Sequence, residues 1–173
     1  MSYASETATC RDLLAKYCVG NGLDLGYGGD PICEHAICID RAPTSEIRAK
    51  CGVHPTHLVG DVARLNWFRD GMLDFCFNSH VLEDALDTEG WLREWIRVLR
   101  PGGLLVTFAP DEQTYRAHCE KTGQPYNLAH VHANFGLKYV RGILDKIGQT
   151  EEVEAIWPFP NNAYSFSLVV RKK

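Results

Sequence analysis

The chain has 173 residues, a length typical of one compact unit with a buried core, and we expect a single domain over residues 1–173. Hydrophobic residues make up 45% of the sequence and charged residues 23%, which excludes a disordered or fibrous chain. The net charge of -4 gives no general attraction to phosphate backbones or anionic membranes, so neither nucleic acid nor membrane is an expected partner.

Cysteine usage points to a reducing compartment. Seven cysteines are present, and no two have the C-x-x-C spacing of a zinc or thiol-redox motif. Cys38 and Cys76 alternate with apolar residues, as reduced thiols do in a protein core. No apolar stretch is as long as that of a signal peptide or of a membrane span, and we therefore expect a cytoplasmic protein.

Short apolar runs alternate with helical or turn-rich segments along the chain. After a leading helix over residues 5–17, the expected strands cover residues 22–25, 35–39, 56–59, 73–77 and 104–109. The clearest helix runs over residues 87–99 and is followed by Arg-Pro-Gly-Gly. Strands that alternate with helices in this way form a mostly parallel sheet with both faces covered.

The C-terminal part contains a polar segment, a helix and a pair of strands. Residues 110–134, with a helix over 111–121, are expected to form a lid. A helix over 135–147 follows, and the strand-like runs 152–157 and 164–171 are expected to form a hairpin. The predicted fold class is α/β, a Rossmann-like three-layer sandwich with a mostly parallel seven-stranded sheet and a C-terminal antiparallel hairpin.

Glycines and carboxylates follow the first two expected strands, at the edge where parallel sheets bind ligands. Asp24 lies near the end of the first strand, and Gly26, Tyr27 and Gly28 come next. Glycines without side chains let backbone N–H groups approach a ligand closely. Asp40 follows the second strand, and its carboxylate is suited to accepting hydrogen bonds from the two hydroxyls of a ribose.

Polar residues also follow the third and fourth expected strands. Gly60, Asp61 and Val62 could meet the edge of an adenine ring, and Asn78 and His80 come after the fourth strand. Each of these residues taken alone could instead serve a turn, a helix cap or a loop, or satisfy nearby backbone. Their succession at four strand ends favours a nucleoside-containing ligand.

These strand ends resemble the cofactor motifs of class I S-adenosylmethionine-dependent methyltransferases, over roughly residues 22–109. The motifs read here as DLGYGGD, CID, GDV, NSHVLED and VLRPGG. The resemblance implies S-adenosylmethionine as the cofactor and methyl transfer as the reaction. The implied cofactor-binding residues are Asp24, Gly26, Tyr27, Gly28, Asp40, Gly60, Asp61, Val62, Asn78 and His80.

The sequence departs from the family pattern after the first strand. Asp30 stands where the family has its third glycine, and Pro31 follows at once. Pro31 also occupies the third glycine position of the G-x-G-x-x-G dinucleotide motif, which disfavours NAD or FAD. Too few residues remain for a crossover helix, so we expect a short loop there. One flank of the cofactor site would then be open or completed by a neighbouring chain, which suggests a homodimer.

Candidates for a general base gather after the fifth expected strand. Tyr115 and His118 lie in this region, and we predict His130, His132 and Asp111 as the catalytic residues because an oxygen or nitrogen acceptor needs its proton removed. His130 and His132 could instead begin a metal site with His118 or Asp111. Spacing across a loop is unspecific, and no metal is predicted.

The nature of the acceptor is open to more than one interpretation. The segment 110–136 is rich in polar, aromatic and histidine side chains, as in a pocket for a small hydroxylated molecule, although a solvated helix and loop has the same composition. We expect the acceptor to be a hydroxyl of a small molecule or saccharide. An alternative is a catalytically inactive methyltransferase-like binding or partner subunit.

Overall fold

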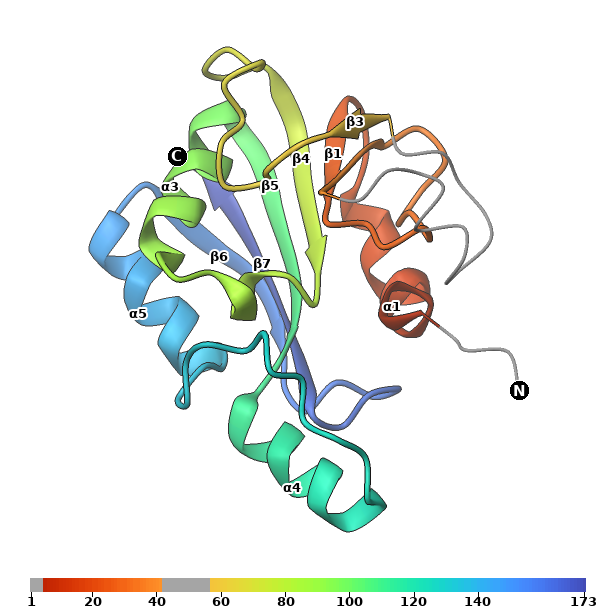
Figure 1. The fold of residues 1–173 in the computed structure, drawn as a ribbon. Coiled ribbons are helices and arrows are strands. Elements are labelled where there is room, and N and C mark those ends of the chain that lie inside the picture. The colour runs from red at the N-terminus through yellow and green to blue at the C-terminus, as the bar shows by residue number, and fades with distance from the viewer. Residues whose placement is uncertain (1–4, 42–56) are drawn as a thin grey trace.

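Seven strands form one mixed sheet in the computed structural model, which describes residues 5–41 and 57–173 (Figure 1). The strands in chain order are β1 (Gly22–Leu25), β2 (Ile37–Asp40), β3 (Leu58–Val59), β4 (Leu73–Ser79), β5 (Leu99–Pro110), β6 (Thr150–Ile156) and β7 (Ser165–Lys172). Across the sheet the order is β3-β2-β1-β4-β5-β7-β6. The first five are parallel, and β7 runs antiparallel to both of its neighbours. The predicted fold class is confirmed.

Helices cover both faces of this sheet. They are α1 (Glu6–Leu14), α3 (Thr88–Val98), α4 (Glu112–Thr122) and α5 (Leu137–Ile147), with short 3-10 turns at Ala15–Tyr17 and Leu82–Asp84. Figure 1 shows α3 and α5 together on one side of the sheet and α1 on the other. The helix α4 follows β5 directly and lies beyond the carboxyl ends of the parallel strands.

The alternation of side chains along β4 supplies the core on both faces. Phe75 and Phe77 point to the side of α1 and pack in one cluster with Leu14, whereas Cys76 points to the side of α3 and packs in a second cluster with Trp95. All five side chains are fully buried. Burial of each large apolar side chain contributes roughly 1.5–3 kcal/mol, so β4 anchors both layers.

Several element boundaries differ from the predictions by one to five residues. The helix expected to end at Leu99 ends at Val98, because Leu99 already pairs with Leu73 as the first residue of β5. The Arg-Pro-Gly-Gly segment therefore lies within a strand rather than in a turn. The strand β2 begins at Ile37 rather than His35. Residue 56 of the third expected strand lies outside the described residues.

The remaining segments agree with the predictions. Turns alone connect β1 to β2 over residues 26–36, as expected from the short spacing. The helix expected over 111–121 is α4, and the C-terminal strands pair as an antiparallel hairpin. Within residues 5–41 and 57–173, no helix is long and apolar enough to cross a membrane.

Candidate functional site

A small cavity lies at the carboxyl ends of β1 and β2, where ligands bind in parallel sheets. Its volume is about 170 Å³ and it is lined by Gly26, Asp40, Arg41, Val62, Val81, Asp84 and Trp91. Ligand pockets typically exceed about 300 Å³, so this cavity accommodates only part of a nucleoside-sized ligand. Gly26, Asp40 and Val62 belong to the predicted set. Arg41 and Trp91 were missed, because no motif marks the residue after Asp40 or a buried aromatic of α3.

Two glycines shape the loop that borders the cavity. Gly26 has a φ of 67°, and a Cβ there would lie 2.3 Å from Cγ2 of Val81. Gly28 has a φ of 61°, and its N–H donates to Oδ2 of Asp40 at 3.1 Å. Glycine adopts this left-handed backbone easily because it has no side chain, and for the same reason it fits beside Val81 at position 26. The loop therefore exposes backbone groups at the cavity.

Asp24 is a buried carboxylate with an unsatisfied oxygen. Its Oδ2 accepts a hydrogen bond from the N–H of Ile32 at 2.7 Å, and its Oδ1 has no hydrogen-bond partner among the described residues. Burial raises the pKa of Asp24 to about 7. A buried acceptor without a donor costs stability.

The residues after β3 are held by local contacts. A Cβ at Gly60 would lie 2.3 Å from Cη2 of Trp67, so this glycine allows the indole to pack on the backbone. Oδ1 of Asp61 accepts from the N–H of Ala63 at 2.9 Å and lies 3.8 Å from the guanidinium of Arg41. Asp61 therefore lies next to Arg41, which lines the cavity.

Three further predicted cofactor residues lie in different surroundings. Tyr27 is buried against Cys38. Asn78 lies within β4 and donates to Oγ1 of Thr107 on β5 at 3.0 Å, while its Oδ1 has no partner among the described residues. His80 does not line the small cavity.

His80 belongs instead to a second cluster beyond the ends of β4 and β5. Its Nε2 lies 3.0 Å from Oγ of Ser165 and 3.7 Å from Oε2 of Glu6. Burial, together with the neighbouring His130, lowers the pKa of His80 to about 3. The ring is therefore neutral at physiological pH.

Two buried carboxylates hold His130 in this cluster. Its Nδ1 donates to Oε2 of Glu112 at 2.7 Å, and its Nε2 lies 3.7 Å from Oε1 of Glu83. Glu112 also pairs with Arg116 at 2.6 Å, whereas burial raises the pKa of Glu83 well above its usual range. The His130 side chain is only 4% exposed.

The other predicted catalytic residues make contacts that stabilise the fold. Nε2 of His132 donates to the carbonyl oxygen of Ala85 at 2.8 Å. Asp111 caps the N-terminus of α4, where its Oδ1 accepts from the N–H of Thr114 at 3.2 Å. His130, His132 and Asp111 thus each contact different partners.

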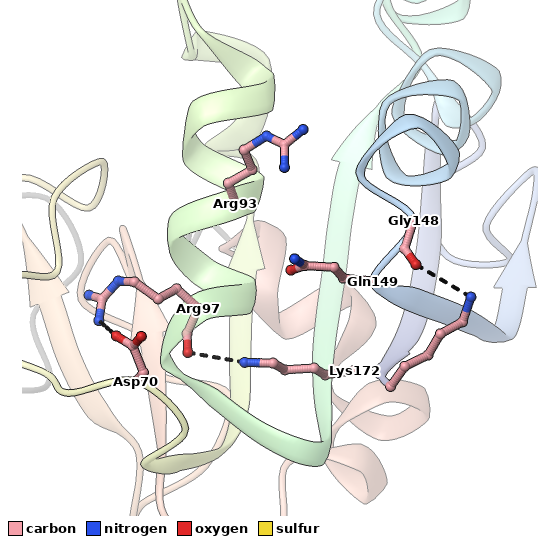
Figure 2. Close-up of a pocket in the computed structure, with 7 residues that line it drawn as sticks. Asp70, Arg93, Arg97, Gly148, Gln149 and Lys172 are labelled. Atoms are coloured by element: carbon pink, nitrogen blue, oxygen red, sulfur yellow. Dashed lines mark hydrogen bonds and ion pairs between the residues drawn. The ribbon is translucent and has the colours of Figure 1, made fainter.

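A larger cavity of about 590 Å³ lies at the amino ends of the parallel strands (Figure 2). Lys172 donates there to the carbonyl oxygen of Arg97 at 3.1 Å, and Lys173 donates to that of Gly148 at 3.5 Å. Arg97 itself pairs with Asp70 at 2.6 Å. The two lysines thus bind the carbonyl ends of α3 and α5, as expected from the helix dipole. Because these side chains serve the helix ends and the cavity lies at the opposite edge of the sheet, it is no candidate for the cofactor site.

Comparison with known proteins identifies the family. The family described as "Methyltransferase domain" matches residues 17–107, which is more than half of the chain. The chain belongs to the methyltransferase domain family. A "Probable S-adenosylmethionine-dependent methyltransferase" of Mycolicibacterium smegmatis is 29% identical over 131 residues, which cover 69% of this chain and 50% of that protein. The chain therefore spans about half the length of this curated relative.

Solved structures share the fold. A chain from the complex between the Haloferax volcanii Trm112 methyltransferase activator and a candidate methyltransferase has a TM-score of 0.68 at 18% identity, covering 95% of this chain and 88% of its own. The Burkholderia thailandensis 1,6-didemethyltoxoflavin-N1-methyltransferase, solved with 1,6-didemethyltoxoflavin and S-adenosylhomocysteine, has a TM-score of 0.67 at 13% identity, with 98% and 79% covered. The predicted class I S-adenosylmethionine-dependent family and its cofactor are confirmed.

Proposed function

We propose that this domain transfers the methyl group of S-adenosylmethionine to a small-molecule acceptor. The observation that carries the proposal is the cavity in which Gly26 and Asp40 lie together at the carboxyl ends of β1 and β2, next to the strand that carries the buried Asp24. The hydroxyl and amino groups of a bound nucleoside would donate hydrogen bonds to the carboxylates of Asp40 and Asp24. The residues present therefore fit the family cofactor.

The chain's own residues would hold and orient the donor. Asp40 would accept hydrogen bonds from the ribose hydroxyls, Asp24 would accept from an amino group, and the 26–28 backbone would lie against the ligand. Val62 and Trp91 supply the apolar lining for an adenine ring. When bound, S-adenosylmethionine supplies an electrophilic methyl group, and the protein mainly aligns the nucleophile and excludes water.

His130 remains the predicted base for a hydroxyl acceptor. A carboxylate that holds one ring nitrogen, as Glu112 does here, is the usual support for a histidine that moves protons. The contacts of His132 and Asp111 favour structural roles for both. The hydroxyl acceptor expected from the sequence stays a prediction.

The cellular setting is part of the same proposal. Within residues 5–41 and 57–173 the cysteines are free, and burial raises the pKa of Cys10 to about 12, which favours the inert thiol. These observations support a reducing, cytoplasmic environment. Homodimerisation remains a prediction that light scattering of the purified protein would test.

The test is calorimetric titration with S-adenosylmethionine and S-adenosylhomocysteine on the wild type, Asp40→Ala and Gly26→Val. We expect micromolar binding, about -8 kcal/mol, that both substitutions weaken. Asp70→Ala, at the opposite cavity, is the matched control and should bind as the wild type does. Absence of binding by a folded wild type would instead favour the inactive partner-subunit interpretation.

A further inference from the structure

A further cavity is lined by residues of α1, α4 and the connection between β6 and β7. Its volume is about 340 Å³, within the range of pockets that bind small molecules. The lining residues are Glu6, Thr9, His118, Asn161, Asn162, Ala163 and Tyr164. Among these described residues there is no lysine or arginine, and Glu6 supplies the one carboxylate that lines the cavity.

Glu6 is held in place by donors from a distant part of the chain. Its Oε1 accepts from the hydroxyl of Tyr164 at 3.1 Å, and its Oε2 accepts from Nδ2 of Asn162 at 2.8 Å. Asn162 is buried, and its own oxygen has no hydrogen-bond partner among the described residues. A buried acceptor without a donor costs stability. The side-chain amide of Asn162 is thus used to hold Glu6.

Aromatic rings surround the carboxylate. The ring of Tyr164 lies 4.9 Å from that of His118, 5.5 Å from that of Tyr115 and 6.2 Å from that of His80, measured between centroids. The faces of such rings attract a cation, and a carboxylate beside them attracts it further. Burial raises the pKa of Glu6, and the hydrogen bonds from Tyr164 and Asn162, together with the nearby His118, offset part of that rise.

The position of Glu6 connects this cavity to the cofactor side of the sheet. His80, which directly follows β4, lies 3.7 Å from Glu6. Ser5, the residue before Glu6, donates through its hydroxyl to the carboxylate of Asp30. Asp30 lies in the loop that contains Gly26 and Gly28. The cavity thus adjoins both the end of β4 and the glycine loop.

From this arrangement we propose that the cavity beside Glu6 binds the methyl acceptor. We propose further that the acceptor is a small primary or secondary amine carrying an aromatic or apolar group. This inference rests on the proposed methyl transfer and sets an amine acceptor against the hydroxyl expected from the sequence. An ammonium group gains charge–charge attraction from the Glu6 carboxylate and cation–π attraction from the Tyr164 ring, whereas a neutral hydroxyl gains only a hydrogen bond to the carboxylate.

The reaction balances without a further reagent. The bound ammonium gives a proton to Glu6, from which it passes to solvent because the Glu6 side chain is 31% exposed. The nitrogen lone pair then forms the new N–C bond while the C–S bond breaks, and the electron pair of that bond stays on sulfur. The products are the methylated ammonium and S-adenosylhomocysteine.

The experiment compares isosteric amines and alcohols in calorimetric titrations of protein saturated with S-adenosylhomocysteine. The probes are tyramine against tyrosol and benzylamine against benzyl alcohol. We expect the wild type to bind the amines at least about tenfold more tightly. Glu6→Gln should abolish this preference while its affinity for S-adenosylhomocysteine stays unchanged. Glu151→Gln, which removes the same charge from the exposed strand β6, should keep the preference.

Tyr164→Phe adds a second variant that keeps the ring and removes one donor to Glu6, and it should keep most of the preference. Equal binding of amines and alcohols, a preference that survives Glu6→Gln, or no binding of any probe would overturn the proposal. The titrations are repeated without S-adenosylhomocysteine. Amine binding through Glu6 in a protein that does not bind S-adenosylhomocysteine would overturn the proposed methyl transfer and retain the amine site.

Discussion

Arg11 and Asp30 form an ion pair that ties α1 to the loop between β1 and β2. Arg11 also donates to the carbonyl oxygen of Pro31 at 3.1 Å, and Asp30 accepts from the hydroxyl of Ser5. Asp30 stands where the family motif has its third glycine. The departure from the motif is therefore a connection between the first helix and the cofactor loop.

A double-mutant cycle measures the strength of this connection. Arg11→Ala, Asp30→Ala and the double variant should show a coupling of about 0.5–1 kcal/mol in urea unfolding. The value is modest because the two side chains are 34% and 28% exposed, and solvent screens the pair. Strictly additive losses would mean that the ion pair contributes nothing in solution.

Gly26 and Gly28 provide a matched pair of glycine substitutions. Both have a left-handed backbone, so alanine at either position should cost about 1 kcal/mol in the free energy of unfolding. A Cβ at Gly26 meets Val81 at 2.3 Å, whereas a Cβ at Gly28 meets only a backbone oxygen at 4.0 Å. Gly26→Ala should therefore cost about 1–3 kcal/mol more. Equal losses in urea unfolding would show that the loop moves away from Val81.

Asp24 should make stability depend on pH. Its pKa is raised to about 7 in the folded protein from 3.8, so between these values the folded state holds a proton that the unfolded state has lost. Stability should fall as pH rises from about 4 to about 7, by at most about 4 kcal/mol, and then level off. Unfolding of the wild type and Asp24→Asn across this range tests the sign, since the variant should lack this decline. A decline of the same size in Asp24→Asn would assign it to other groups.

His132 and Asp111 should affect stability more than chemistry. His132→Ala removes the donor to the buried carbonyl of Ala85, and Asp111→Ala removes the cap of α4, so each should cost about 1–2 kcal/mol. Affinity for S-adenosylhomocysteine should stay unchanged in both. A fall in turnover of more than about a hundredfold in fully folded variants would restore their predicted catalytic role.

The sequence predicted part of the lining of the small cavity, because the signals for those residues are local. Gly26, Gly28 and Asp40 stand within or directly after short apolar runs, and parallel strands bring such ends to one edge. Trp91 could not be found in the same way. It lies on a helix among other apolar residues, and only the packing of α3 against the sheet places it at the cavity.

The sequence by itself determined the strand and helix order, the glycine turns and the carboxylate after β2, because these depend on neighbouring residues and on backbone geometry. Only the tertiary structure decided which side chains meet across the fold. Glu6 contacts Tyr164, which is 158 residues away, and His132 contacts Ala85, which is 47 residues away. Such contacts depend on how layers pack, and no spacing along the chain encodes that packing.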